Sequence, residues 1–140
     1  TELGILTGLT DLSVNTNKLN GTVPIELGRL TRLEYLWLHE NVLTGTIPTE
    51  IGKLSLLYEL AIHTNQLDGT IPTEIGLLTA LTLLDVAINQ LTGTVPTELG
   101  ELSDLSYLYI NINQLNGTIP IELTRLTGLE ILWLHRNVLT

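Results

Sequence analysis

The sequence contains no cysteine, no methionine and no phenylalanine, and its basic residues are scarce. Without cysteine the chain can form no disulfide, no thiol nucleophile and no cysteine-ligated metal site. Six Lys and Arg residues against 15 Asp and Glu give a formal net charge of −9. This balance argues against nucleic acid and anionic membranes as partners, since phosphate contacts need clustered basic side chains. No apolar run approaches the ~18 residues of a membrane span, so we expect no membrane insertion in this segment.

What the sequence has in abundance is a repeat. The chain matches itself at an offset of 24 residues, with units that begin near positions 6, 30, 54, 78, 102 and 126. Apolar residues recur at fixed phases of the unit, for example Leu12, Leu36, Leu60, Leu84, Leu108 and Leu132. One unit cannot bury its own apolar face, whereas stacked units bury a continuous core. We therefore predict a single repeat domain over residues 1–140.

Each unit combines a strand pattern with a turn pattern. Apolar and variable residues alternate in the LxLxx segment, which predicts a short strand, and stacked strands ~4.8 Å apart form a parallel sheet. A GT[IV]P step follows, and we predict its proline at the first position of a short helical turn (Pro24, Pro48, Pro72, Pro96, Pro120). Four glycines are predicted to end these turns as left-handed caps, at Gly28, Gly52, Gly76 and Gly100.

The complete unit, LxxLxxLxLxxNxLxGx[IV]PxELGx, is carried by segments such as LTGTIPTEIGKL (43–54) and LDGTIPTEIGLL (67–78). It resembles the leucine-rich repeat in its plant-type 24-residue subclass, and the resemblance covers the whole chain. The resemblance implies an α/β fold, a right-handed β-α superhelix with a parallel concave sheet and short helical turns on the convex side. The subclass is common in plant receptor-kinase ectodomains and in secreted proteins of plants and algae. It therefore implies a protein that is secreted or faces the extracellular side of a membrane.

A second, longer period suggests a larger parent protein. Residues 20–44 and 116–140 agree at 20 of 25 positions, including the pairs Trp37/Trp133 and His39/His135. We infer a duplicated four-unit block. Solenoids need polar caps to hide their terminal cores, and the sequence shows none, so we expect the chain to be part of a longer array.

Several polar ladders have a structural interpretation. One asparagine per unit is predicted to bond the backbone of the neighbouring unit (Asn17, Asn41, Asn65, Asn89, Asn113, Asn137). A glutamate lies two residues after each proline, early in the predicted helical turn, where its carboxylate interacts favourably with the helix dipole. Weak divalent-cation binding by this row of carboxylates is the alternative. A threonine ladder suits an exposed strand edge, with ice or mineral binding as the alternative.

The variable positions of the strands carry the functional signal. All the Trp and His residues fall in these variable positions on the predicted concave face, and so does every Tyr except Tyr58. Tyr58 lies just before the variable positions of its unit. Exposed aromatic clusters are typical of binding surfaces, although rings that merely cover the strand backbone remain the alternative. We predict these ligand-binding residues: Tyr35, Trp37, His39, Glu59, His63, Asp85, Tyr107, Tyr109, Trp133 and His135.

Two further site types come from local patterns. His39 and His63 fall on adjacent units, so their rings could approach each other, and Glu40 or Glu59 could complete a metal site; exposed neutral histidines are the alternative, and we expect no metal. Asn20 and Asn116 begin Asn-Gly-Thr glycosylation sequons in predicted loops.

The sequence favours a non-enzymatic binding module of an extracellular protein. Its expected partner is a peptide, protein or glycan laid across the concave strands. No phosphate loop or HExxH motif appears, so we expect no enzyme and no cofactor. A structural, adhesive or peripheral assembly role for the array is the main alternative, followed by ice or mineral binding.

Overall fold

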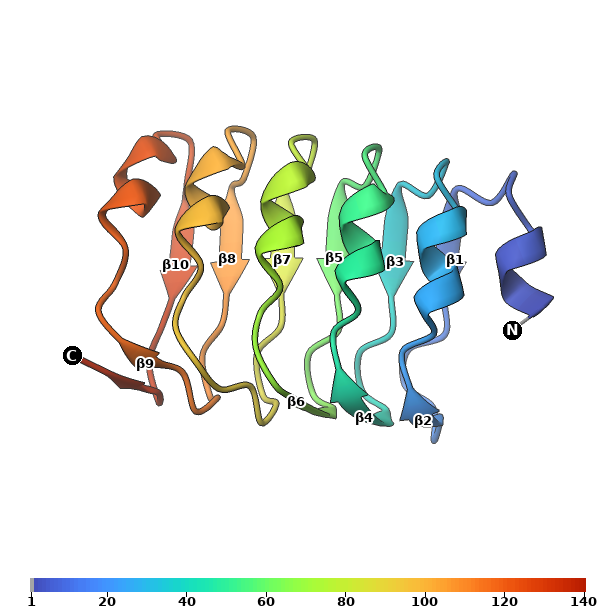
Figure 1. Cartoon of the computed structure of the whole chain (residues 1–140), viewed down its shortest axis with the longest axis horizontal. Helices are drawn as coiled ribbons and strands as arrows, with labels where there is room; N and C mark the ends of the chain where they lie inside the picture. The colour runs from blue at the N-terminus through green and yellow to red at the C-terminus, as the bar shows by residue number, and fades with distance from the viewer. Residues whose placement is uncertain (1) are drawn as a thin grey trace.

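The computed structural model describes residues 2–140, and Thr1, the first residue of the predicted domain, lies outside the described residues. The chain forms a solenoid in which successive rungs stand side by side (Figure 1). Within residues 2–140 each rung carries a short 3-10 helix: η1 (Glu2–Ile5), η2 (Ile25–Arg29), η3 (Thr49–Lys53), η4 (Thr73–Leu77), η5 (Thr97–Glu101) and η6 (Ile121–Arg125). The helical turns predicted from sequence are therefore present, and they are 3-10 rather than α-helical.

Opposite the 3-10 helices lies a parallel six-stranded sheet (Figure 1). Its strands are β1 (Asp11–Ser13), β3 (Tyr35–Trp37), β5 (Glu59–Ala61), β7 (Leu83–Asp85), β8 (Tyr107–Tyr109) and β10 (Ile131–Trp133). Their register pairs Leu36 with Leu60 and Leu60 with Leu84, which reproduces the 24-residue offset of the sequence. The predicted fold class, a leucine-rich-repeat type of solenoid with a parallel concave sheet, is confirmed.

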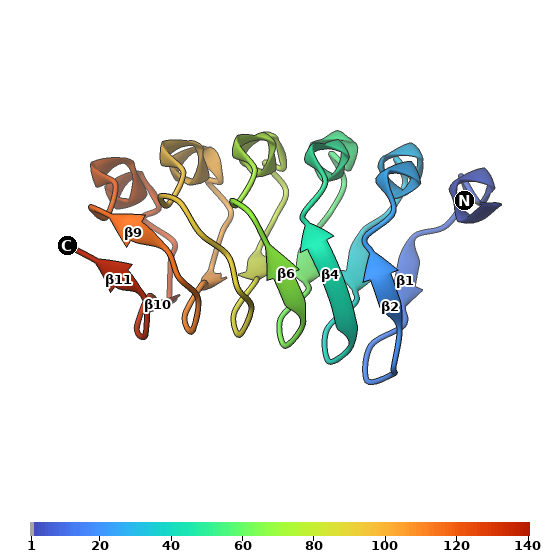
Figure 2. The same ribbon diagram turned by 60° about the horizontal axis from the view of Figure 1, so that its bottom comes forward.

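Further short strands line a second side of the solenoid (Figure 2). They are β2 (Asn20–Thr22), β4 (Val42–Thr46) and β6 (Gln66–Asp68) in one parallel sheet, and β9 (Asn116–Gly117) and β11 (Val138–Leu139) in another. The sequence predicted that the sequons at Asn20 and Asn116 lie in loops. In the structure they instead begin short strands. Both asparagines are exposed, because these strands lie at the surface.

The interior is filled by the aliphatic ladders. Leu36, Leu60, Leu84 and Leu108 are fully buried, and every buried hydrophobic residue in 2–140 is Leu, Ile, Val or Ala. Removing this much aliphatic surface from water is the main source of stability for a stacked fold. The prediction that no Trp, Tyr or His enters the core is confirmed.

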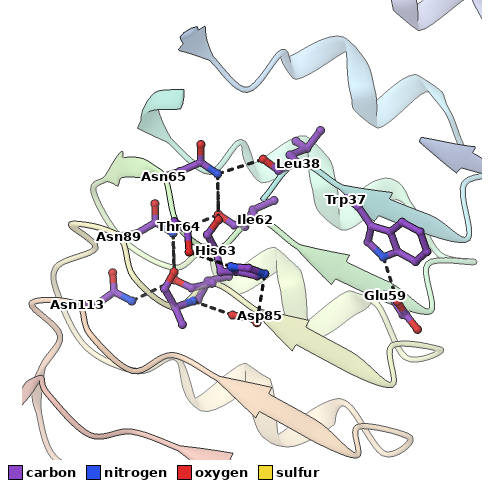
Figure 3. A network of polar contacts seen from close by, with 12 residues as sticks. Trp37, Leu38, Glu59, Ile62, His63, Thr64, Asn65, Asp85, Asn89 and Asn113 are labelled. Atoms are coloured by element: carbon purple, nitrogen blue, oxygen red, sulfur yellow. Dashed lines mark hydrogen bonds and ion pairs between the residues drawn. The ribbon is translucent and has the colours of Figure 1, made fainter. Parts of the chain in front are cut away.

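The asparagine ladder ties successive rungs together. Asn65 donates from Nδ2 to the carbonyl oxygens of Leu38 (3.1 Å) and Ile62 (3.1 Å), and its Oδ1 accepts the Leu43 N–H (3.0 Å). Figure 3 shows Asn65, Asn89 and Asn113 in this arrangement. Leu38 and Leu43 belong to the preceding rung, so the predicted inter-unit bonding is confirmed.

Two details of the helical turn differ from the sequence-based prediction. Pro48 lies one residue before η3, at the N-cap, with extended backbone (ψ 137°), and its carbonyl accepts the first helical N–H from Ile51. Gly52 lies inside η3 and has no left-handed backbone. A Cβ there would stand 2.6 Å from the carbonyl oxygen of Glu74 in the next rung. Close approach between helical turns, rather than a left-handed cap, therefore requires this glycine.

Candidate functional site

The variable residues of the six-stranded sheet form columns on its concave face. One of these columns, formed by the last residue of each strand in register, consists of Ser13, Trp37, Ala61, Asp85, Tyr109 and Trp133. Successive side chains of a strand point to opposite faces of the sheet. Because Leu36 points into the buried core, its neighbours Tyr35 and Trp37 point to the concave face. The columns are those predicted from sequence, and within them the side chains gather into two groups.

The first group is an N-terminal aromatic cluster of Tyr35, Trp37, Tyr58 and Glu59. The rings of Tyr35 and Trp37 meet edge to face, with centroids 5.8 Å apart, and Tyr58 lies 6.2 Å from Tyr35. The indole Nε1 of Trp37 donates a hydrogen bond of 3.0 Å to Glu59, which Figure 3 shows. The Glu59 carboxylate therefore already accepts a hydrogen bond from a side chain of the preceding rung.

Two histidines separate this cluster from the second group. The rings of His39 and His63 stack with centroids 4.5 Å apart and planes 17° apart. Burial first, and then the neighbouring His63, lower the pKa of His39, and Glu40 and Asp85 partly oppose this shift. The predicted approach of the two rings is thus present.

The histidine stack is poorly arranged for a metal ion. Ring nitrogens bind metals in the plane of the imidazole, and the in-plane directions of two parallel stacked rings do not converge. The carboxylates considered as further ligands are turned elsewhere: Glu59 accepts from Trp37, and Glu40 accepts from Thr16. Among residues 2–140 no group of three His, Cys, Asp or Glu side chains is placed to hold a metal.

The second group surrounds a hollow of ≈370 Å³ at the carboxyl ends of β7, β8 and β10. Its lining residues are His63, Asp85, Ala87, Ile88, Tyr109, Asn111 and Trp133. The rings of Tyr109 and Trp133 stand at 75° with centroids 5.0 Å apart, and His135 packs 5.8 Å beyond Trp133. A hollow of this size lies near the lower end of the range for small-ligand sites.

Asp85 is the charged group of this hollow. Its Oδ1 accepts the backbone N–H of Ala87 (3.0 Å), and its Oδ2 lies 3.9 Å from Nε2 of His63 (Figure 3). Burial raises the pKa of the Asp85 carboxyl above its usual range, and the Ala87 N–H and both nearby histidines partly offset the rise. A half-buried carboxylate whose charged form is disfavoured is typical of functional sites.

The ten predicted binding residues therefore do not form one site. His63, Asp85, Tyr109 and Trp133 line the hollow, while His39 and His135 touch its walls through ring contacts. Tyr35, Trp37 and Glu59 belong to the N-terminal aromatic cluster. Tyr107 instead donates a hydrogen bond of 3.0 Å to Glu130, which raises the pKa of its hydroxyl.

Three residues of the hollow were not singled out from sequence: Ala87, Ile88 and Asn111. Ala87 and Asn111 occupy the same column as His39, His63 and His135, so their position in the repeat was the available signal. The small side chain of Ala87 leaves open the space that a histidine would fill at this phase.

Ile88 is held in an unusual conformation. It has φ of +53° and is 44% exposed, although β-branched residues strongly disfavour left-handed backbone. Each described rung has a non-glycine residue with positive φ at this phase, from Thr16 to Arg136. The repeat imposes the backbone, and an isoleucine here places an apolar side chain at the edge of the hollow.

Across the described part of the chain, no helix has the length and hydropathy that a bilayer crossing requires.

Comparison with known proteins gives one matching family model, described as Leucine Rich Repeat, over residues 32–54. No curated protein matches the chain. The crystal structure of a TDR receptor is 35% identical, with a TM-score of 0.97, over 99% of this chain and 24% of that one. The ectodomain of the Arabidopsis receptor kinase HAESA, in complex with an N-terminally extended IDA peptide hormone, is 36% identical, with a TM-score of 0.95, over 99% and 23%.

A shorter solved structure is covered more completely. A chain from the BIR3–SERK2 complex of Arabidopsis thaliana is 35% identical, with a TM-score of 0.82, over 92% of this chain and 68% of that one. The chain thus spans about a quarter of the length of the TDR and HAESA structures and two thirds of this smaller one.

Proposed function

The chain belongs to the leucine-rich repeat family, in its plant-type form, and on this basis we propose that it is a non-enzymatic ligand-binding module whose concave face takes a peptide or protein segment. The observation that carries the proposal is the hollow beside Tyr109 and Trp133. It combines aromatic walls, one carboxylate and one buried amide, which is the mixture of apolar surface and few polar groups typical of ligand sites.

The placement of the aromatic residues supports a binding role. The core is complete without them, since it consists of aliphatic side chains alone. Tyr35, Trp37, Tyr107 and Tyr109, on strands inside the sheet, keep part of their surface exposed on the concave face, and that surface contributes little to folding. Trp and Tyr offer large contact area at a small cost in conformational entropy, and they dominate the binding energy of many interfaces.

The solved structures support a peptide or protein ligand over a glycan. The HAESA ectodomain was crystallised with a peptide hormone, and the BIR3 and SERK2 chains were crystallised with each other. The reported matches indicate no catalytic family. We extend these properties to this chain as part of the proposal, together with an extracellular location and glycans on the exposed Asn20 and Asn116.

Selection from a random peptide display library tests this role. We expect peptides that bind the 140-residue chain and lose about 30-fold in affinity when Trp133→Ala removes one wall of the hollow, since truncating a central aromatic typically costs ~2 kcal/mol. Leu77→Ala is the control, because Leu77 is also a well-exposed apolar residue (64%) but lies on η4, opposite the concave face. Selected peptides that bind both variants like the unsubstituted chain would contradict the proposal and favour a structural role for the array.

A further inference from the structure

Among residues 2–140 the Asp85 carboxylate has no cationic partner closer than His63, and that contact is loose. Its Oδ1 is engaged by the Ala87 N–H, but the group nearest to Oδ2 is His63 Nε2, at 3.9 Å, beyond hydrogen-bond reach. No Lys or Arg of residues 2–140 forms an ion pair with it. The Asp85 side chain is only 20% exposed, and a carboxylate removed from water to this extent normally has a compensating partner. One of its oxygens is therefore available to a donor from outside the chain.

Asn111 supplies a second available acceptor. The residue is 5% exposed and lines the same hollow, and its Oδ1 has no hydrogen-bond partner among the described residues. Buried amide oxygens in native proteins are nearly always paired, so a buried and unpaired Oδ1 in a residue that lines a hollow points to a ligand donor, which reaches it when the amide turns toward the hollow. Asn111 directly follows the buried ladder residue Ile110. It therefore occupies the position in its repeat unit that Ala87 occupies in the unit before.

Two aromatic rings and one aliphatic side chain complete the hollow. Tyr109 follows Asp85 in one column of the sheet, on the next strand, and Trp133 follows Tyr109 one strand further on. Their planes are 75° apart, which gives a bound group two ring surfaces of different orientation. The exposed side chain of Ile88 lies along the lining as an apolar contact.

We infer that this hollow recognises the guanidinium group of an arginine in the bound peptide, an inference that rests on the peptide-binding role proposed above. The guanidinium donates to Oδ2 of Asp85, which accepts no hydrogen bond within the described residues, and to Oδ1 of Asn111 once this amide turns toward the hollow. Its plane stacks on one of the two rings, Tyr109 or Trp133, and meets the other nearly at right angles, and its aliphatic stem lies against Ile88.

Arginine matches these groups better than lysine does. The guanidinium is planar, carries five N–H donors and is weakly hydrated, so it can stack on a ring and reach two separate acceptors at once. The lysine ammonium is a compact and strongly hydrated charge, and stacking is not open to it. The formal net charge of −9 favours a basic peptide at longer range.

Two capped tripeptides test the assignment: acetyl-Gly-Arg-Gly-amide, and the same peptide with citrulline, a neutral isostere of arginine. Binding to the 140-residue chain is followed through the indole N–H signal of Trp133 in NMR titrations. We expect the arginine peptide to bind about tenfold more tightly than the citrulline peptide, because hydrogen bonds to charged groups are the stronger ones. Asp85→Asn abolishes this preference, while Asp68→Asn, at an exposed carboxylate on β6, preserves it.

The outcomes separate this inference from the proposed function. Equal affinity for both peptides, no shift of the Trp133 signal with either, or a preference that survives Asp85→Asn overturns the arginine assignment. In those cases the proposed peptide-binding role still stands if peptides selected from the library lose affinity for the Trp133→Ala variant. If the library yields no Trp133-dependent peptide while the tripeptides show the expected preference, the hollow recognises guanidinium groups but the peptide-binding role fails.

Discussion

The imidazole rings of His39 and His63 lie nearly parallel, with centroids 4.5 Å apart. The two histidines follow β3 and β5, the strands that carry Trp37 and Glu59, and His63 contributes to the wall of the hollow. At this distance His63 adds to the effect of burial in lowering the pKa of His39, so the protonation of His39 is disfavoured in the folded chain.

We predict that His39 makes the fold less stable in mild acid. Burial and His63 lower the pKa of His39, outweighing the opposing effects of Glu40, Asp85 and the Ala61 backbone. A depressed pKa means that the neutral ring is favoured in the folded state. Its contribution to stability is therefore complete above the unfolded value of 6.5 and is lost as the pH falls through the lower folded pKa.

Urea unfolding between pH 7.5 and about pH 4.5 measures this effect. His39→Gln should show a smaller drop in unfolding free energy over that range than the unsubstituted chain. His135→Gln, at an exposed histidine in the same column, is the control and should follow the unsubstituted chain. An identical drop in the His39→Gln variant would show that the stack does not titrate as described.

We predict that Asp85→Asn stabilises the fold at neutral pH. Burial raises the pKa of Asp85, so ionisation is disfavoured in the folded state. The stability that its protonated form provides is present below the unfolded pKa of 3.8 and is lost as the pH rises through the raised folded value. Asparagine has no charge to desolvate, and its Oδ1 can still accept the Ala87 N–H.

Thermal and urea unfolding at pH 7 and about pH 3 check this prediction. The variant should have the higher unfolding free energy at pH 7, and the difference should shrink in acid. Asp68→Asn, at an exposed site, should change little at either pH. A destabilised Asp85→Asn chain at pH 7 would mean that the carboxylate is structural rather than reserved for a ligand.

We predict that Gly52→Ala destabilises the chain by about 1–3 kcal/mol, the usual cost of overpacking. The added Cβ would meet backbone and side-chain atoms of Glu74 at 2.6–2.7 Å, where neither can move without shifting the next rung. Gly128→Ala is the matched control, because nothing lies within 4 Å of its added Cβ. Equal unfolding free energies for the two variants would refute close helix stacking as the reason for this glycine.

We predict that Asn65→Ala lowers the unfolding free energy by about 2 kcal/mol or more, since it leaves several part-buried backbone groups unpaired. Asn65 bonds Leu38, Leu43 and Ile62, so the loss affects two rungs. Asn17→Ala is the control, because Asn17 is exposed and its side chain donates its hydrogen bonds within its own rung, to the carbonyl oxygens of Val14 and Asn15. Similar losses for both variants would count against inter-rung bonding as the source of stability.

The sequence predicted the features that depend on repeat phase alone. The columns of the concave face and the asparagine ladder follow from a constant 24-residue register, because every rung repeats the same backbone geometry. The place of Pro48 and the role of Gly52 could not be read in this way. They depend on how closely neighbouring helical turns approach, and the sequence gives no measure of that distance.

The hollow was only partly predictable for a related reason. From the repeat pattern alone, every aromatic residue on the concave face, from Tyr35 to Trp133, was an equal candidate. Their division into two groups depends on which way each side chain turns and on the small Ala87 between larger neighbours. Asn111 looked like an ordinary variable residue, and only its burial and its unpaired Oδ1 distinguish it.

The central claim is that the concave hollow is where a ligand binds. Hydrogen exchange of the chain, with and without a selected peptide, tests it most directly, because exchange reports the protection of individual backbone segments. We predict that exchange slows in segments 85–88, 109–112 and 133–136, while the 3-10 helices on the opposite side keep their rates. Protection confined to η2–η6, or spread evenly over all the rungs, would contradict a binding site at this hollow.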